Sequence, residues 1–308
     1  MTVPTVEVRA PATTANLGPG YDCLGMALDL WNRLTVSVQP AGESASVEVV
    51  GEGDGELATD TENLTYRAME FLYGEADEEM PPLKMKCENT IPLSRGMGSS
   101  AAAISGGLVA ANALLDNPFT PNDLLEMAAT IEGHPDNVAA AVHGGLQLVI
   151  TDDQQLYTAP IAVPEELQAV LYIPERRIAT VDARRVLPAE VSVADAVYNM
   201  SRAALLVAGM QSNHPEYLSI ATQDRLHQPY RQTIFPPMKV IFEAARNAGA
   251  LGVFLSGSGS TILALTQERS MTVAYEMFDA ARLAGVEGRV EVTRPTVQGA
   301  HVVSVAGS

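Results

Sequence analysis

The stretch Pro92-Leu-Ser-Arg-Gly-Met-Gly-Ser-Ser-Ala-Ala102 decides how this sequence is interpreted. Apolar and polar residues alternate before it, over Leu83–Glu88, which predicts a strand, and the small residues after it predict a helix that runs to Leu115. Glycines allow backbone N–H groups to approach an anion closely, and a helix N-terminus adds partial positive charge. The stretch therefore predicts a phosphate-binding loop, although a plain strand–turn–helix corner would also use small residues here.

The loop differs from two familiar nucleotide-binding loops. It is not a Walker A loop because no lysine follows its second glycine, and it lacks the third glycine of the dinucleotide fingerprint. Ser99 and Ser100 instead supply hydroxyl groups that can contact phosphate oxygens or a metal ion. The uncharged run Gly96–Leu115 has 20 residues, enough to span a membrane. Its content of Gly, Ala, Ser and Asn indicates a buried helix of a soluble protein instead.

Composition and charge exclude several classes of function. The chain has 308 residues, of which 37 are acidic and 19 are basic, for a formal net charge of -18. Such a charge argues against binding to nucleic acid or to an anionic membrane. Cys23 and Cys87 are too few for a disulfide scaffold or a cysteine-based zinc site, and they fit a reducing cytoplasm. The first residues have no basic start and no long apolar stretch, so we expect no signal peptide and a cytoplasmic protein.

Strands and helices alternate along the rest of the chain, which predicts an α/β or α+β protein. The length suggests two domains, and we expect them to be 1–165 and 166–308, because Pro160–Pro164 has the composition of a linker. We also expect a small-residue loop over Pro11–Gly20. The other strands are expected at Val3–Arg9, Leu34–Val38, Ser46–Val50, Leu146–Ile150, Leu167–Ile173, Val253–Leu255, Thr261–Leu265 and Gly288–Val292. The other main helices are expected at Asn63–Tyr73, Pro121–Ile131, Val193–Gln211, Pro237–Ala248 and Ser270–Ala284.

Three segments together resemble the motifs of the GHMP kinases. The loop at 92–102 resembles the central motif, Ala10–Asp22 the first and Leu255–Thr261 the third, in the order and at the spacing of that family. Met97 and Ser260 stand where the family usually has Leu and Pro. The resemblance implies an α+β, two-lobed GHMP kinase fold. Its N-terminal lobe would be a ribosomal-protein-like α/β sandwich, its C-terminal lobe would be ferredoxin-like, and the active site would lie between them.

The same resemblance implies ATP and Mg²⁺ as cofactors. Glu132 and a loop serine, with Ser99 favoured over Ser100, would hold the metal ion. Asn63 would approach the adenine, although a helix N-cap explains an asparagine there equally well. The residues implied for ATP are Asn63, Pro92, Leu93, Ser94, Arg95, Gly96, Met97, Gly98, Ser99, Ser100, Ala101 and Ala102.

Two further segments, together with the first motif, resemble the branch of this family that phosphorylates L-homoserine. The two are Thr180–Pro188 and Gln228–Gln232. By this resemblance Asp22 would face the substrate ammonium group with Asn16 beside it in the amino-acid pocket, while Arg184 and Arg231 would bind the carboxylate. Alternatively, Asn16 and Asp22 belong to an Asx-rich loop that caps a helix starting near Asp22, and each arginine taken alone would be assigned to the surface.

The segment Glu132-Gly-His-Pro-Asp-Asn137 would lie beside the substrate hydroxyl. By the resemblance Asn137 contacts that hydroxyl, and Asp136 occupies the place of a catalytic aspartate in mevalonate-type relatives. Whether Asp136 acts as a base is open, since phosphoryl transfer can proceed by positioning and charge neutralisation. His134 is expected to be structural.

The implied activity is the ATP-dependent phosphorylation of the side-chain hydroxyl of L-homoserine to O-phospho-L-homoserine, a step of threonine biosynthesis. A homodimer is also suggested by the resemblance. Two alternatives are a small-molecule kinase of the mevalonate or shikimate type and a catalytically silent ligand-binding protein of the same fold. The presence of Glu132 and of the loop serines argues against the silent protein.

Overall fold

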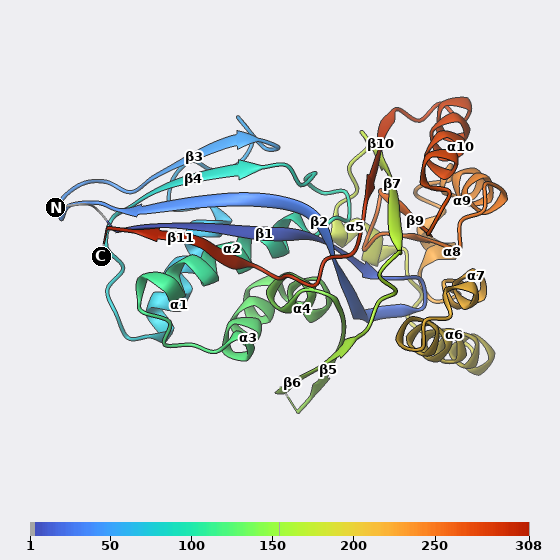
Figure 1. Cartoon of the computed structure of the whole chain (residues 1–308), viewed down its shortest axis with the longest axis horizontal. Coiled ribbons are helices and arrows are strands. Elements are labelled where there is room, and N and C mark those ends of the chain that lie inside the picture. Colours follow the sequence, from blue (N-terminus) through green and yellow to red (C-terminus); the bar gives the residue numbers. More distant parts are fainter. Residues whose placement is uncertain (1–3, 154, 308) are drawn as a thin grey trace.

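Two β-sheets organise the computed structural model, which describes residues 4–153 and 155–307. Within these residues the larger sheet has seven strands: β11-β1-β2-β4-β3 in order, with β5 paired to β2 and β6 to β5. Only β3 and β4 pair in parallel (Figure 1). The strands are β1 (Thr5–Asn16), β2 (Gly20–Val38), β3 (Ser46–Gly51), β4 (Leu83–Asn89), β5 (Leu146–Asp152), β6 (Gln155–Ile161) and β11 (His301–Ala306).

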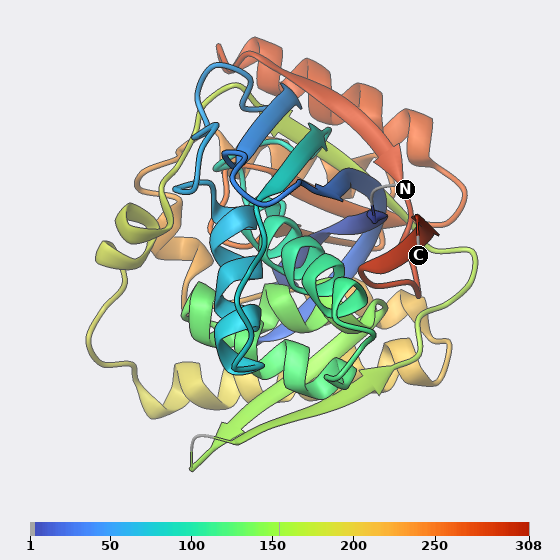
Figure 2. The same cartoon turned by 90° about the vertical axis from the view of Figure 1, so that its left-hand side faces the viewer.

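Four helices cover one face of the larger sheet (Figures 1 and 2). They are α1 (Leu64–Glu75), α2 (Ser99–Leu114), α3 (Pro121–Glu132) and α4 (Pro135–His143). The small residues of α2 allow a close approach to α1, because a Cβ at Gly107 would lie 2.6 Å from the Thr65 carbonyl oxygen. Helix α2 is therefore buried between β1 and its neighbouring helices. None of the described helices has both the length and the apolar content needed to cross a bilayer.

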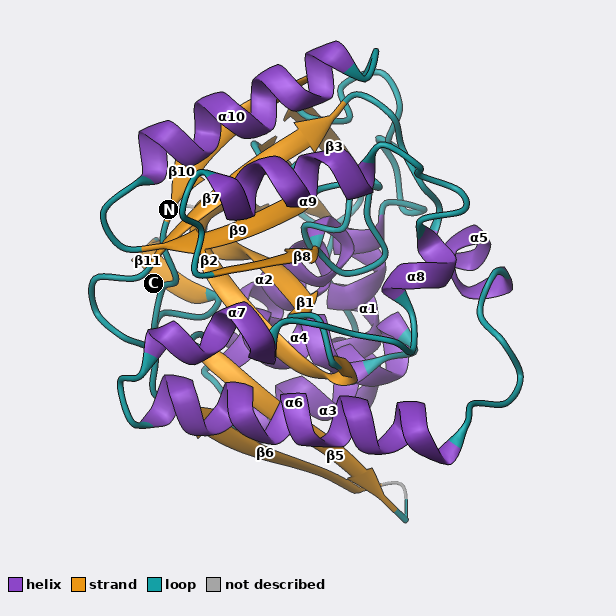
Figure 3. Ribbon diagram, turned by 90° about the vertical axis from the view of Figure 1, so that its right-hand side faces the viewer, coloured by secondary structure: helices purple, strands orange, loops and turns teal. Residues whose placement is uncertain are grey.

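The smaller sheet contains β7 (Gln168–Pro174), β8 (Gly252–Leu255), β9 (Ile262–Thr266) and β10 (Gly288–Thr293) in the order β10-β7-β9-β8. Helices α9 (Met238–Asn247) and α10 (Ser270–Leu283) cover one face of it (Figure 3). When β7 to β10 are numbered 1 to 4 along the chain, their order in the sheet is 4-1-3-2. The connection from β9 to β10 contains one helix, α10. This is the split βαβ arrangement of ferredoxin-like folds, so the predicted α+β class is confirmed.

The remaining helices connect β7 to β8 and carry two of the predicted site residues. They are α5 (Thr180–Arg185), α6 (Val193–Gln211), η1 (Pro215–Tyr217), α7 (Leu218–Ala221) and α8 (Gln228–Arg231). An apolar core between the sheets includes Leu17, Met26, Leu206 and Phe254, so side chains from both halves of the chain are packed together.

One sequence prediction near the N-terminus is wrong. Residues 11–16 continue β1, and β2 begins at Gly20, so the predicted Pro11–Gly20 loop shrinks to the turn 17–19. The helix considered near Asp22 is absent from the described residues, and Asp22 lies in β2 with φ of +56°. The cause is that residues 10–16 are buried without interruption, so the period-2 pattern of a half-buried strand never develops.

The predicted strand Val3–Arg9 corresponds to the start of β1, except that Val3 lies outside the described residues. The predicted Leu34–Val38 is the second half of β2. Strands β6 and β11 were not expected from any sequence pattern. Residue 165 lies between β6 and β7, whereas β11 returns to the larger sheet beside β1 (Figure 2). The division into 1–165 and 166–308 stays a prediction.

The three motif segments 10–22, 92–102 and 255–261, called the first, second and third motif loops although the first includes the end of β1, contact one another where the two sheets approach. The backbone N–H of Thr13 donates to the Met97 carbonyl at 3.1 Å, and that of Gly257 donates to the Ala15 carbonyl at 3.1 Å. Thr261 N–H donates to the Arg95 carbonyl, also at 3.1 Å. Each loop is therefore held by the other two.

The fully buried Ser256 reinforces this junction. Its Oγ donates to the Gly96 carbonyl oxygen at 2.5 Å and lies 2.8 Å from Thr14 Oγ1. Gly96 has φ of +74°, and a Cβ at this position would lie 2.0 Å from the Ser256 carbonyl oxygen. The glycine is thus required by close loop packing, whatever the loop binds.

Gly96→Ala is expected to destabilise the protein through both backbone strain and this clash. Gly42→Ala is a matched control, because Gly42 also has positive φ (+93°) but a Cβ added there would have no atom within 4 Å. Gly42→Ala should lower the free energy of unfolding by about 1–2 kcal/mol because of the left-handed conformation. Gly96→Ala should lower it by a further ~1–3 kcal/mol because of overpacking. Urea unfolding measures both. Equal losses would contradict the role given to the contact with Ser256.

Candidate active site

A cavity of about 420 Å³ lies at the junction of the three loops. Its walls come from the 92–100 loop, the start of α2, the α3–α4 connection, β2, α5 and α8. The cavity brings together most residues predicted for ATP, metal and substrate. Those that line it are Asn16, Asp22, Asn63, Pro92, Leu93, Ser94, Gly96, Met97, Gly98, Ser99, Ser100, Glu132, Asp136, Asn137, Arg184 and Arg231.

Three of the described residues predicted for ATP lie away from the cavity wall. Ala101 and Ala102 are buried in the packing of α2. Arg95 directs its guanidinium away, since Nε donates to the Pro174 carbonyl at 2.7 Å and Nη2 to that of Glu175 at 3.0 Å. Arg95 therefore connects the loop to the end of β7.

The N-terminus of α2 opens onto the cavity. Gly98 is the N-cap residue, with φ of +66°, and a Cβ there would lie 1.8 Å from Thr13 Oγ1. Ser99 and Ser100 form the first turn of this 16-residue helix. Free backbone N–H groups and the helix dipole at such an end favour an anion such as phosphate.

Ser100 and Glu132 form a close pair beside this helix end. Ser100 Oγ donates to Glu132 Oε1 at 2.5 Å, and the Glu132 side chain is only 10% exposed. Burial raises the pKa of Glu132, while the hydrogen bond from Ser100 opposes that shift. Gly133 ends α3 in the left-handed conformation and Pro135 opens α4, which fixes the direction of the turn.

These oxygens fit a magnesium ion bound partly by nucleotide. Within residues 4–153 and 155–307 no group of three or more His, Cys, Asp or Glu side chains is arranged to hold a metal ion. Mg²⁺ commonly takes only one or two protein carboxylates and completes its shell with phosphate and water oxygens. The carboxylate–hydroxyl pair matches that requirement.

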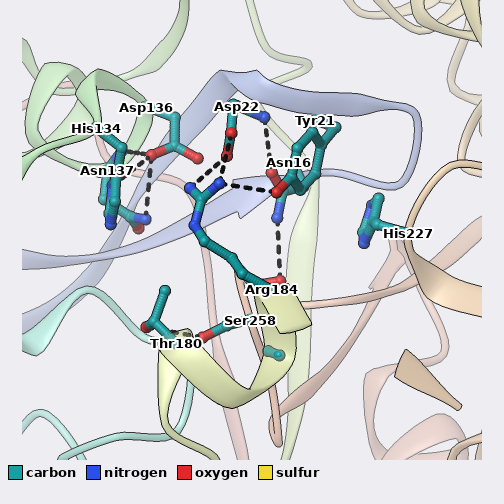
Figure 4. A network of polar contacts seen from close by, with 12 residues as sticks. Asn16, Tyr21, Asp22, His134, Asp136, Asn137, Thr180, Arg184, His227 and Ser258 are labelled. Atoms are coloured by element: carbon teal, nitrogen blue, oxygen red, sulfur yellow. Dashed lines mark hydrogen bonds and ion pairs between the residues drawn. The ribbon is translucent and has the colours of Figure 1, made fainter. Parts of the chain in front are cut away.

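The residues after Glu132 form a second polar group (Figure 4). Asp136 Oδ1 accepts from the Asn137 backbone N–H at 2.8 Å and lies 3.1 Å from His134 Nδ1. This hydrogen bond raises the pKa of His134. Asn137 Oδ1 accepts from Thr13 Oγ1 at 2.7 Å, which leaves the amide nitrogen of Asn137 on the side of Asp136. His134, expected to be structural, also lines the cavity.

Asn16 shapes the turn that carries Asp22. Its Oδ1 accepts from the Asp22 backbone N–H at 3.0 Å, and its Nδ2 donates to the Gly257 carbonyl at 3.0 Å. Both Asn16 and Asp22 have positive φ, a conformation that asparagine and aspartate tolerate better than most residues. The side chain of Asn16 therefore links the first loop to the third.

Asp22 and Arg184, predicted to bind opposite ends of a substrate, contact each other. Arg184 Nη1 and Nη2 each lie 2.9 Å from a different Asp22 oxygen, a bidentate ion pair with both side chains about 40% exposed (Figure 4). The hydrogen bond to Asp22 raises the pKa of Arg184. Arg184 Nη1 also donates to the Tyr21 hydroxyl at 2.9 Å.

Arg231 approaches the same region from α8. It is 2% exposed, and its Nη1 donates to the Gly257 carbonyl at 2.8 Å, while Nε lies 3.3 Å from the Ala183 carbonyl oxygen. Nη2 makes no hydrogen bond within the part of the chain that the structure describes. The centroid of the Tyr21 ring lies 5.7 Å from Cζ of Arg184 and 5.5 Å from Cζ of Arg231, so one ring is close to both guanidinium groups.

Asn63 serves as the N-cap of α1. Its Oδ1 accepts from Thr65 N–H at 3.0 Å and its Nδ2 donates to the Ala58 carbonyl at 2.7 Å, so the N-cap alternative is confirmed.

Sequence reasoning missed Tyr21, His227 and the Thr180–Ser258 contact of 3.3 Å. Tyr21 directly precedes Asp22, and His227 directly precedes the Gln228–Gln232 segment, but only the fold shows what they touch.

Comparisons with known proteins agree with this geometry. The family description "GHMP kinases N terminal domain" matches residues 63–145, and "GHMP kinases C terminal" matches residues 198–282. The homoserine kinase of Moorella thermoacetica is 43% identical, covering 96% of this chain and 99% of that protein. The homoserine kinase of Synechocystis sp. is 40% identical, covering 97% and 98%.

Solved structures give the same result. A crystal structure of homoserine kinase from Cytophaga hutchinsonii has a TM-score of 0.89 at 30% identity and covers 97% of both chains. The L. major mevalonate kinase has a TM-score of 0.71 at 15% identity, covering 94% of this chain and 95% of that one, which shows a shared fold alone. The chain therefore belongs to the GHMP kinase family, in the branch that contains the homoserine kinases.

Proposed function

We propose that this enzyme transfers the γ-phosphoryl group of ATP to the side-chain hydroxyl of L-homoserine, giving O-phospho-L-homoserine and ADP. Beyond the family, the proposal is supported above all by one observation. A single cavity joins an anion-binding helix end to a cluster with one carboxylate and two guanidinium groups. Such a cluster matches a zwitterionic amino acid. The homodimer and the cytoplasmic location stay predictions of the sequence.

The amino-acid end of the substrate would meet Asp22, Arg184 and Arg231. In the free protein Asp22 and Arg184 neutralise each other. A zwitterion entering between them offers an ammonium group to Asp22 and a carboxylate to Arg184, so both charges remain paired. Arg231 Nη2 is a further donor for the carboxylate. A ligand with only one of the two charges would leave one partner uncompensated, which disfavours mevalonate and shikimate.

ATP would bind with its phosphates at the 92–100 loop and the N-terminus of α2. Glu132 and Ser100 would hold Mg²⁺. The sequence favoured Ser99 for this role, but the hydrogen bond between Ser100 and Glu132 favours Ser100. When bound, the ion neutralises charge on the β- and γ-phosphates. The Ser99 hydroxyl lines the same cavity and is available to a phosphate oxygen.

Asn137 and Asp136 would receive the substrate hydroxyl. The bond from Thr13 fixes the Asn137 amide, so that its nitrogen can donate to the hydroxyl oxygen. Asp136 is held by His134 and by the Asn137 backbone, and lies next to that point. The hydroxyl oxygen then forms a bond to the γ-phosphorus as the bond to the ADP oxygen breaks, and the hydroxyl proton passes to Asp136 or to an oxygen of the transferred phosphoryl group. Orientation and charge neutralisation supply most of the catalysis in this type of reaction.

A substrate panel tests the proposed reaction. ADP release from Mg-ATP is measured with L-homoserine, D-homoserine, L-serine, mevalonate and shikimate, each offered separately. We expect strong turnover with L-homoserine alone, because of the five compounds only L-homoserine combines both charges, the L configuration and a hydroxyl group on Cγ. Turnover with mevalonate or shikimate would overturn the roles of Asp22, Arg184 and Arg231, and ATP binding without turnover would favour a silent ligand-binding protein.

Arg184→Gln is expected to raise the KM for L-homoserine about 10- to 100-fold. This is the factor that corresponds to losing a charge-assisted hydrogen bond of about 1.5–3 kcal/mol. The KM for ATP should change less than about twofold. Arg185→Gln is the matched control, since Arg185 lies on the same helix but is solvent-exposed and paired with Asp182. Steady-state kinetics with each substrate varied separates the effects. Equal changes in both KM values would argue against carboxylate binding by Arg184.

Glu132→Gln is expected to lower kcat by on the order of 100-fold, because a preorganised charge near the transferring phosphoryl group is lost. The Mg²⁺ concentration for half-maximal rate should rise in parallel. Glu126→Gln provides the control, because Glu126 is an exposed residue of the same helix. Activity is titrated with Mg²⁺ at fixed ATP. An unchanged Mg²⁺ dependence in Glu132→Gln would show that the ion is held elsewhere.

A further inference from the structure

His227, the residue before α8, is completely buried and uses both ring nitrogens. Nε2 lies 2.7 Å from the Gly18 carbonyl oxygen, and Nδ1 lies 3.1 Å from Arg231 Nη1. Its ring also contacts the Tyr21 ring at a centroid distance of 5.3 Å (Figure 4). One side chain therefore connects the first motif loop to the buried arginine.

These two contacts determine the tautomer of His227. A guanidinium nitrogen can only donate, so Nδ1 must accept and carries no proton. A carbonyl oxygen can only accept, so Nε2 carries the proton. Burial lowers the pKa of His227 to about 4. The positive charge of Arg231 adds to this shift, whereas Asp224, whose Oδ2 lies 3.5 Å from Nε2, opposes it. The imidazole is thus neutral at pH 7, so His227 adds no positive charge of its own beside Arg231.

The Gly18 end of this connection is fixed. Gly18 has φ of +88°, and a Cβ there would lie 2.2 Å from the Thr222 carbonyl oxygen, so the turn is packed tightly against the C-terminal half. Gly18 lies between Asn16 and Asp22 on that turn. The contacts of His227 therefore set Arg231 relative to the turn that carries Asp22.

Among the residues that the structure describes, Arg231 has three hydrogen-bond acceptors, and only His227 contributes a side chain. The others are the carbonyl oxygens of Gly257 and Ala183. Nη1 is shared between Gly257 and His227, which fixes the guanidinium plane and leaves Nη2 as the group for a ligand. Rotation of the guanidinium about its axis would break the contact with His227.

We infer that His227, as the neutral Nε2–H tautomer, is a positioning residue that holds Arg231 at a set distance from Asp22 for recognition of the substrate carboxylate. This inference rests on the proposed function, because it assigns Arg231 to the carboxylate of an α-amino acid. His227 itself does not line the cavity among the described residues, and it acts through Arg231.

Two substitutions separate the two ends of the imidazole. In His227→Gln the longer amide reaches the Nε2 position and can donate to Gly18, but the acceptor for Arg231 is lost. In His227→Asn the amide oxygen lies near the Nδ1 position and can still accept from Arg231. We expect His227→Gln to raise the KM for L-homoserine about 10-fold, with the KM for ATP and kcat within about twofold. His227→Asn should recover a large part of the loss.

A substrate without the carboxylate provides the sharpest control. 3-Amino-1-propanol retains the hydroxyl and the ammonium group of homoserine, and we expect its kcat/KM to be the same for wild type and His227→Gln within about twofold. His214→Gln, the same change at an exposed histidine, should leave all constants unchanged. An equal loss with 3-amino-1-propanol, or an equal rise in the KM for ATP, would overturn the inference.

A double-mutant cycle with Arg231→Lys tests whether His227 acts through Arg231. We expect the two effects on the KM for L-homoserine to be strongly non-additive, because lysine cannot make the fixed contact with Nδ1. Additive effects would contradict the positioning role.

Nitrogen-15 NMR of the wild-type protein measures the protonation of the two ring nitrogens of His227 and does not depend on an activity assay. His227, assigned by the signal missing from His227→Gln, should show a protonated Nε2 and an unprotonated Nδ1 from pH 6 to pH 8. A protonated Nδ1, or titration in this range, would overturn the inference. If the tautomer is as expected but wild type does not phosphorylate L-homoserine, the proposed function is wrong, and the carboxylate role fails with it.

Discussion

The hydroxyl of Ser256 is the contact on which the rest of the structure depends. It bonds to the Gly96 carbonyl and contacts Thr14, so it lies where the first, second and third motif loops meet. These loops belong to different sheets, and Thr14 and Ser256 are 242 residues apart in sequence. Because each loop forms part of the cavity wall, the cavity exists only when both sheets are docked. Binding and folding thus depend on the same short set of contacts between these loops.

The strong negative charge of the chain explains why its arginines near the cavity are held so firmly. A net charge of -18 repels anionic ligands at long range, so recognition has to come from a few fixed donors. Arg95 and Arg231 donate to backbone carbonyls, and Arg184 forms a bidentate pair with Asp22. A guanidinium that is already oriented loses little conformational freedom when a ligand binds, which increases affinity and selectivity.

Much of this arrangement could be predicted from local sequence. The Gly/Ser loop followed by small residues indicated a strand, a loop and a buried helix, and Pro121 marked the start of α3, where the structure adds a capping box formed by Thr120 and Asp123. The Pro11–Gly20 segment could not be recognised as a strand because burial on both faces removes the alternation that identifies one. His227 and Tyr21 could not be assigned, since their partners lie far away in sequence. The contact between Asp22 and Arg184 could not be predicted either, because each residue taken alone indicates only a charge that needs a partner.

The pairing of β11 with β1 has a consequence for synthesis of the chain. Thr5 pairs with Ala306, so one edge of β1 stays without its neighbour until residues 301–306 have been translated. During that time the nascent larger sheet presents unpaired N–H and C=O groups, the kind of edge on which other chains can add strands. A ribosome-bound chain therefore stays open to such strand addition until residues 301–306 leave the ribosome and cover that edge of β1.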